Sequence, residues 1–135
     1  VSAYIPRNYI KNQKTRVNIY RDLGMAESFE KIEDIKKNLD KKYGKIPKIV
    51  LDLLGISKIK YLLVSAGIER LKYSKGKGIV IKSIVLDEEK FKKIENNNPD
   101  ILYQPQFKQI TIKNMDKKID LDLVIGYLGD IISAM

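Results

Sequence analysis

Apolar residues recur at helical spacing through the first third of the chain. Over residues 13–23 they fall three positions apart, and Gly24 follows as a natural helix stop. A second helix is predicted over about residues 28–43, because Ser28 can cap its amino end and Gly44 can terminate it. Its apolar stripe consists of Ile32, Ile35 and Leu39. The stripe predicts which side of this helix faces a core and which side stays polar.

A third helix is predicted from Pro47, which suits a first helical position, to a stop at Gly67. Gly55 lies inside it and costs about 1 kcal/mol relative to alanine, so the helix could bend or break there. Ahead of the first helix, residues 4–10 surround Pro6, which fixes an extended or turn conformation. We call residues 4–10 the lead-in, and we expect it to be extended and to pack onto the body of the protein.

After Gly67 the pattern changes from a helical to an extended period. The predicted elements are strands over 68–73 and 79–85 joined by a glycine-containing loop, a helix from Asp87 to about 96–98, strands over 101–103 and 109–113, and a closing helix over about 118–134. The strands should pair into one antiparallel sheet. The predicted fold class is therefore α+β, with helices packed with a small antiparallel sheet of about four strands.

The length of 135 residues fits one domain, so we expect residues 1–135 to form a single domain around one core. No run approaches the roughly 18 apolar residues that a membrane span needs. The chain starts without an initiator methionine or a signal sequence. We expect it to be cytoplasmic and to be part of a longer protein.

The formal net charge of +9 raises nucleic acid as a partner, because lysine and arginine neutralise phosphates. The basic residues are mostly lysines spread along the whole chain, and arginine, whose planar fork suits phosphate and base edges, is scarce. The 8 tyrosines are also scattered, which favours core-edge residues with solvated hydroxyls over base-stacking platforms. We therefore expect at most weak, non-specific DNA binding that vanishes near physiological salt. A sequence-independent nucleic-acid-binding domain stays the alternative function, and lysines converging on one face would favour it.

Candidate catalytic chemistry is sparse, because the chain has no cysteine and no histidine. The loop Ser74–Gly78 places lysines between glycines as a phosphate-binding loop does, but it leads into a strand, which favours a hairpin turn. Asp120 and Asp122 do not share a helix face, so we interpret them as helix-start charges and not as a catalytic pair. We expect no cofactor, no metal and no catalytic residue. A hydrolase or transferase would need a carboxylate or lysine with a perturbed pKa in a pocket.

Several short motifs follow one another in the first half of the chain. They are Ala3-Tyr4-Ile5-Pro6, Tyr9-Ile10, Arg16, Tyr20-Arg21 with Leu23, Tyr43-Gly44, Ile46-Pro47 and Leu53-Leu54. In this order they resemble the carboxy-terminal domain of the bacterial transcription-repair coupling factor family (Mfd), which reads approximately A-Y-I-P-x-x-Y-I, Y-x-R-L and D-R-F-G-x-L-P. The second half resembles the family only in its order of elements. The motif residues that we expect to be structural are Tyr4, Ile5, Pro6, Arg16, Tyr20, Arg21, Tyr43, Gly44 and Pro47.

The resemblance implies a role inside a larger machine. The full-length family proteins are ATP-driven DNA translocases that displace stalled RNA polymerase and recruit nucleotide-excision repair through UvrA. Their carboxy-terminal domain carries no ATPase motif; it docks on the amino-terminal UvrB-like module of the same protein, covers the UvrA-binding surface and restrains the motor. The implied partner of this chain is that UvrB-like module, with UvrA and RNA polymerase as indirect partners. DNA would be contacted by the parent protein, and no membrane is involved.

The chain departs from the family around the motif E-L-x-D-R-F-G. It reads Asn38-Leu39-Asp40-Lys41-Lys42-Tyr43-Gly44, so Asn38 and Lys41 occupy the two acidic positions of the motif. A docking contact made by this segment would therefore need a different charge partner here. The resemblance gives Asn38, Lys41 and Lys42 as the candidate docking residues, and it carries nothing catalytic to this chain.

Overall fold

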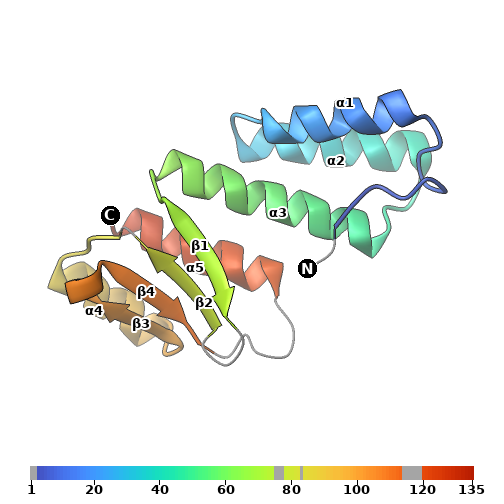
Figure 1. Cartoon of the computed structure of the whole chain (residues 1–135). Coiled ribbons are helices and arrows are strands. Elements are labelled where there is room, and N and C mark those ends of the chain that lie inside the picture. Colours follow the sequence, from blue (N-terminus) through green and yellow to red (C-terminus); the bar gives the residue numbers. More distant parts are fainter. Residues whose placement is uncertain (1–2, 75–77, 83, 114–119) are drawn as a thin grey trace. The chain divides into compact units, whose positions relative to one another are not determined.

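The computed structural model describes residues 3–74, 78–82, 84–113 and 120–135. Its elements are α1 (Gln13–Gly24), α2 (Phe29–Tyr43), α3 (Lys48–Ser65), β1 (Arg70–Ser74), β2 (Gly78–Lys82), α4 (Glu88–Asn97), β3 (Ile101–Gln104), the 3-10 turn η1 (Pro105–Phe107), β4 (Gln109–Ile112) and α5 (Leu121–Ser133) (Figure 1). The predicted α+β class is confirmed. The chain groups into two compact units, residues 1–61 and residues 62–135. The single domain over residues 1–135 stays a prediction.

The first unit contains the lead-in, α1, α2 and most of α3, and in it α1 and α2 lie side by side (Figure 1). Its buried apolar side chains form two clusters. One consists of Ile5, Ile10, Leu39, Ile46 and Val50, and the other of Leu23, Ile32 and Leu54. Ile35 packs against both clusters, so the predicted apolar stripe of α2 faces the core as expected.

Local capping explains where the helices of the first unit begin and end. The hydroxyl of Ser28 accepts a hydrogen bond of 3.2 Å from the amide of Lys31, which satisfies one free donor at the start of α2. Gly44 follows the last residue of α2 with φ of 83°, a backbone conformation that favours glycine. Gly55 is buried inside α3, which continues through it without a break.

The second unit is built on an antiparallel sheet with the strand order β1-β2-β4-β3. Side chains alternate across the sheet, and those on one face are buried: Ile79, Ile81, Ile101, Ile110 and Ile112. Helices α4 and α5 cover this face (Figure 1). Val124, Leu128 and Ile131 of α5 complete the core from the helical side. The other face of the sheet carries polar and charged residues.

Two element boundaries in the second unit differ from the sequence prediction for a structural reason. The first strand begins at Arg70, because the amide of Ile68 bonds the carbonyl of Leu63 at 2.9 Å and thereby closes α3. The second strand ends at Lys82, and the amide of Ile84 then bonds the backbone outside the strand ladder. Both segments had an extended period in the sequence, but the amide of Ile68 closes a helix and the amide of Ile84 bonds the distant carbonyl of Lys108.

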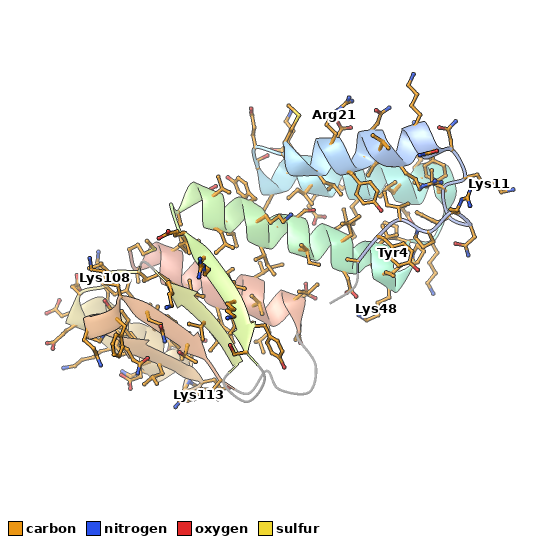
Figure 2. All side chains as sticks on the ribbon, viewed as in Figure 1. Tyr4, Lys11, Arg21, Lys48, Lys108 and Lys113 are labelled. Carbon is orange, nitrogen blue, oxygen red and sulfur yellow. The ribbon has the colours of Figure 1, made fainter. Side chains whose placement is uncertain are left out.

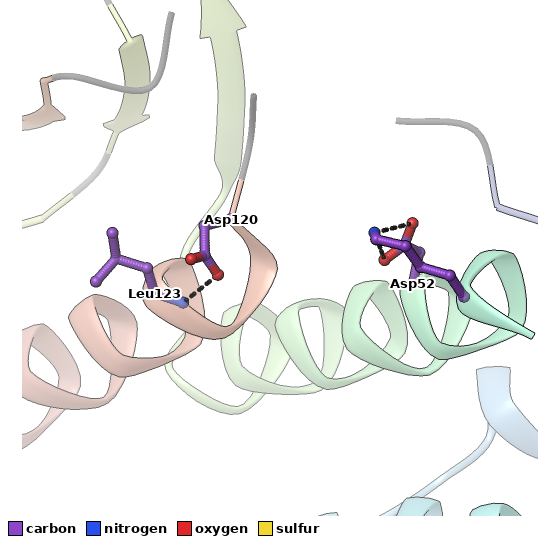
Figure 3. Close-up of polar contacts among 4 residues, drawn as sticks. Asp52, Asp120 and Leu123 are labelled. Atoms are coloured by element: carbon purple, nitrogen blue, oxygen red, sulfur yellow. Dashed lines mark hydrogen bonds and ion pairs between the residues drawn. The ribbon is translucent and has the colours of Figure 1, made fainter. Parts of the chain in front are cut away.

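The remaining predicted elements lie close to their expected positions. Asp120 caps α5 by accepting a hydrogen bond of 3.2 Å from the amide of Leu123 (Figure 3). Ser74 pairs with Gly78 at the end of the predicted hairpin, while residues 75–77 of its loop lie outside the described residues. Residues 118–119, where the closing helix was expected to start, also lie outside them.

None of the helices in the part of the chain that the structure describes combines the length and the apolar character that a membrane crossing requires.

Candidate docking surface

The lead-in is held against the first unit by two buried isoleucines and a local turn. Ile5 and Ile10 are almost fully buried and pack with Leu39 of α2 and Val50 of α3. The carbonyl of Pro6 accepts hydrogen bonds of 3.1 Å from the amides at positions 9 and 10. The lead-in is therefore a packed turn, and its apolar side chains tie together the first unit.

Two side chains of α1 form hydrogen bonds with backbone groups of the lead-in and of the residue after it. The Tyr20 hydroxyl accepts a hydrogen bond of 2.7 Å from the amide of Ile5. The guanidinium of Arg16 donates to the carbonyl of Ile10 at 2.7 Å and to that of Lys11 at 3.0 Å. A backbone segment without regular structure needs such partners when it is buried. Both residues belong to the sequence motifs that carry the resemblance.

Tyr9 connects the lead-in to the carboxyl end of α2. Its hydroxyl donates to the carbonyl of Gly44 at 2.9 Å and lies 3.2 Å from the carbonyl of Leu39. The hydroxyl has one hydrogen, so it donates to one of these two carbonyl oxygens at a time. The ring of Tyr9 packs at a tilt on the ring of Tyr43, with centroids 5.8 Å apart. Burial raises the pKa of Tyr9, and the charge of Asp40 adds to that rise, so the phenol is a neutral donor at physiological pH.

The candidate docking residues Asn38, Lys41 and Lys42 lie on this same end of α2, and all are exposed. Lys41 and Lys42 follow Asn38 by three and four positions, so their side chains are neighbours of Asn38 on the helix surface. Within the described residues, none of the three makes a side-chain hydrogen bond or an ion pair. The two lysines complement the negative end of the helix dipole. We call Asn38, Lys41 and Lys42 the α2 tip.

An ion pair joins the first half of α2 to α3. The ammonium of Lys58 lies 2.5 Å from a carboxylate oxygen of Glu33 and 5.8 Å from the centre of the Phe29 ring. The hydrogen bond from Lys58 and its positive charge lower the pKa of Glu33. This pair adds a polar contact between α2 and α3 to the buried apolar cluster of Leu23, Ile32 and Leu54, so α2 contacts the rest of the first unit at several points.

Three further motif residues are not part of the α2 tip. Tyr4 and Arg21 are exposed and are labelled in Figure 2, where Arg21 projects from the outer side of α1. Arg21 lies 3.9 Å from Asp22 in an exposed ion pair. Pro47 is partly buried, and its carbonyl accepts the first hydrogen bonds of α3. Lys48 and Asp52 form an ion pair of 3.1 Å on the first turn and a half of that helix (Figure 3).

Sequence reasoning missed two features of possible functional importance. The resemblance included Tyr9 among the motifs but did not identify it as the residue that holds the α2 tip. The charge was also expected to be diffuse, whereas Arg70, Lys72, Lys82 and Lys113 lie together on one face of the sheet. The alternation of polar and apolar residues in the strands was the signal that could have found this cluster.

Neither a metal centre nor a phosphate loop emerges from the described residues. They contain no group of three or more acidic side chains that could hold a metal ion. The lysines of the glycine-containing loop at 74–78 lie outside the described part, and its ends at Ser74 and Gly78 belong to paired strands.

Comparison with known proteins relates the whole arrangement to one group. A family model described as the TRCF domain matches residues 1–94. The transcription-repair-coupling factor of Staphylococcus aureus (strain USA300) is 35% identical over 104 residues, which cover 77% of this chain and 8% of that protein. The protein of the same name from Staphylococcus epidermidis is 36% identical over 81 residues, which cover 60% of this chain and 7% of that protein. This chain therefore spans less than a tenth of the length of these relatives.

A solved structure supports the same relation at the level of the fold. The crystal structure of the C-terminal domain of a transcription-repair coupling factor superposes with a TM-score of 0.80. The match covers 99% of this chain and 89% of that chain, at 20% sequence identity. Both halves of the chain therefore follow the same fold, including the second half, where the sequence offered only an order of elements.

Proposed function

This chain belongs to the TRCF domain family, and from that premise we propose that it is the non-catalytic regulatory domain of a transcription-repair coupling factor. It docks on the amino-terminal UvrB-like module of the same protein. Docking masks the surface that binds UvrA and restrains the motor. The parent acts as an ATP-driven DNA translocase that removes stalled RNA polymerase and recruits nucleotide-excision repair.

The observation that carries the proposal is the α2 tip. It exposes two cations and an amide on a helix end that the lead-in holds in place through Tyr9. Lys41 and Lys42 have no ionic partner among the described residues, so the fold of this chain does not require their charges. Residues that are exposed, charged and rigidly presented are suited to a contact outside the domain.

The charge of the α2 tip defines the surface it would meet. Two adjacent lysines favour an acidic partner surface, because complementary potentials steer association and disfavour wrong contacts. The docking surface on the UvrB-like module should therefore be acidic opposite Lys41 and Lys42. Asn38 would add a neutral hydrogen-bonding group to the contact.

The proposal is tested by reversing the charge of the α2 tip in the full-length parent. Lys41→Glu/Lys42→Glu places repulsion against an acidic docking surface and costs the domain itself under about 1 kcal/mol. We expect higher affinity for UvrA and faster basal ATP turnover, because the masking contact weakens. Both are measured on the purified parent and on the variant.

The matched control is Lys92→Glu/Lys93→Glu on α4, an adjacent pair of exposed lysines in a helix. It applies the same charge change in the second unit and should leave UvrA affinity unchanged. Equal UvrA affinity in the parent and in the α2-tip variant, with unchanged thermal melting, would show that docking uses another surface.

The non-catalytic part of the proposal has its own test. Isothermal titration of the 135-residue chain with ATP and magnesium should give no binding heat. Saturable binding at micromolar ATP would contradict a purely regulatory domain.

A further inference from the structure

The open face of the sheet gathers cations from three of its strands. Arg70 and Lys72 of β1, Lys82 of β2 and Lys113 next to β4 line a groove of about 560 Å³. The other residues that line it are neutral, and helices α4 and α5 lie on the opposite side of the sheet (Figure 1). Figure 2 labels Lys113 in the same view. We call these four side chains the sheet-face cations.

Strand register brings like charges close together on this face. Arg70 is the direct partner of Lys82 in the β1–β2 ladder. Side chains in such positions have Cβ atoms about 4.5–5.5 Å apart, and like charges placed there destabilise the sheet. Lys72 lies two positions along β1 from Arg70 and diagonally across from Lys82. The sheet-face cations therefore repel one another until an anion lies between them.

Nothing in the described part of the chain neutralises them. No described ion pair involves any of the four side chains, and no carboxylate lines the groove. Elsewhere three described lysines form ion pairs with a carboxylate: Lys48 with Asp52, Lys58 with Glu33 and Lys90 with Asp87. The open sheet face is thus a local concentration of positive potential on a chain of net charge +9.

The floor of the groove distinguishes between kinds of anion. It consists of small or neutral side chains, among them Ser74, Val80 and Thr111, and no aromatic ring lines it. Without aromatic rings the face offers no stacking platform for unpaired bases. Three of the four cations are lysines, which contact phosphate as point charges without reading base edges.

The dimensions of the face match a phosphate backbone. From the Gln109 end of β4 to Lys113 the strand runs about 13 Å at roughly 3.3 Å per residue. Successive phosphates of one strand of duplex DNA rise about 3.4 Å along the helix axis and also wind round it, so they lie about twice that distance apart in space, and the face meets two or three of them. Cations at the ends and along the β1 edge of the groove can therefore contact successive phosphates of one strand.

We propose that the sheet-face cations form a sequence-independent binding site for the phosphate backbone of duplex nucleic acid. The site is weak by itself, because it has only Arg70, Lys72, Lys82 and Lys113 to neutralise phosphates. It becomes useful when the chain is tethered to a protein already on DNA, since tethering raises the effective concentration. The site lies in the second unit and does not depend on docking by the α2 tip.

Fluorescence anisotropy with a labelled 20-base-pair duplex of random sequence tests the site on the 135-residue chain. With two or three phosphates contacted, the logarithm of affinity should fall against the logarithm of salt with a slope of about −2 to −3. Lys72→Glu/Lys82→Glu should weaken binding at low salt at least about tenfold and make the slope shallower, to about −1. The new carboxylates face Arg70, so thermal melting should show no loss of stability.

Lys92→Glu/Lys93→Glu on α4 is the matched control, because it changes the net charge equally on the other side of the sheet. It should weaken duplex binding by less than about threefold, through long-range charge alone. Equal losses of duplex affinity in the two variants would overturn the site, because net charge alone would then explain the binding. Tighter binding of single-stranded DNA than of duplex would overturn the duplex assignment. Displacement of the duplex by polyglutamate at a lower charge concentration than by unlabelled duplex would assign the face to an acidic protein segment instead.

Discussion

Tyrosine hydroxyls hold the chain together at several points. The hydroxyl of Tyr20 accepts a hydrogen bond from the amide of Ile5, and that of Tyr9 donates one to the carbonyl of Gly44. The hydroxyl of Tyr103 accepts a hydrogen bond of 3.0 Å from the amide of Leu86. Each tyrosine bonds a backbone group at least 15 residues away in the sequence. Removing a hydroxyl from such a position therefore costs more than a surface hydrogen bond would, because a part-buried partner loses its bond.

Tyr20→Phe should destabilise the chain by about 1–2 kcal/mol, because the amide of Ile5 then lacks a partner. A loss of this size lowers the melting temperature by about 3–7 °C for a protein of this length. Tyr4→Phe is the control, since Tyr4 is 53% exposed, and its effect should stay within about 0.5 kcal/mol. Identical melting of the two variants would mean that water replaces the Tyr20 hydroxyl without loss.

The Glu33–Lys58 ion pair predicts a pH dependence. The hydrogen bond from Lys58 lowers the pKa of Glu33 in the folded state. The ion pair therefore stabilises the folded state fully above the pKa of an unfolded glutamate, about 4.3. This stabilisation is lost as the pH falls through the lower pKa that Glu33 has in the folded state. Glu33→Gln should cost under about 1 kcal/mol at pH 7, because the carboxylate is partly exposed, and nothing near pH 2.

Thermal melting of both proteins at pH 7 and near pH 2 measures this difference. Glu95→Gln on α4 changes an exposed carboxylate outside the ion pair and serves as the control. A cost of Glu33→Gln that stays the same at both pH values would show that packing, and not the charge of Glu33, is responsible.

At the scale of elements, the sequence predicted most of what capping and periodicity determine. The stripe of α2 and its ends at Ser28 and Gly44 were predicted correctly, because each depends on residues within a few positions. The strand ends at Arg70 and Lys82 were not, because nearby amides bond acceptors outside the strand ladder: Ile68 bonds Leu63 at the end of α3, and Ile84 bonds the distant Lys108. The sheet-face cations were also missed, since alternation places each one on the polar side of its own strand, but only the strand order β1-β2-β4-β3 brings them together.

In the candidate site, too, the sequence predicted some features and the fold was needed for others. The motifs pointed to Asn38, Lys41 and Lys42, and the structure places them together on an exposed helix end. The role of Tyr9 in holding that end required the fold, because its acceptor lies 35 residues away in the sequence. A contact of that sequence separation leaves no local pattern.

The start of β2 makes an element-scale prediction. Gly78 has φ of 89°, and a Cβ built there would collide with the backbone carbonyl of Ile112 on β4. Gly78→Ala should therefore cost at least about 2 kcal/mol in chemical denaturation, because neither backbone can yield without breaking the ladder. Gly126→Ala on α5 is the control: a Cβ there meets nothing within 4 Å, and alanine should stabilise the helix by up to about 1 kcal/mol. A neutral Gly78→Ala would contradict the close approach of β2 and β4.

At the scale of the whole molecule, the two units carry different basic surfaces. The α2 tip in the first unit is small and lies at a helix end that Tyr9 contacts through a hydrogen bond to Gly44, which suits a protein contact. The sheet-face cations in the second unit form a broader groove without acidic residues, which suits a phosphate backbone. The relatives that the chain matches are more than ten times as long as the matched segment, and in the proposed function both surfaces would act inside such a parent.

The central claim is that this chain masks the UvrA-binding surface by docking on the UvrB-like module. The most direct measurement adds the 135-residue chain in trans to a parent protein that lacks it and follows the affinity of that parent for UvrA. The account predicts that the chain lowers UvrA affinity in a saturable way and that Lys41→Glu/Lys42→Glu weakens this competition at least about tenfold. Unchanged UvrA affinity at saturating chain, with calorimetry showing the chain bound to the UvrB-like module together with UvrA, would contradict it.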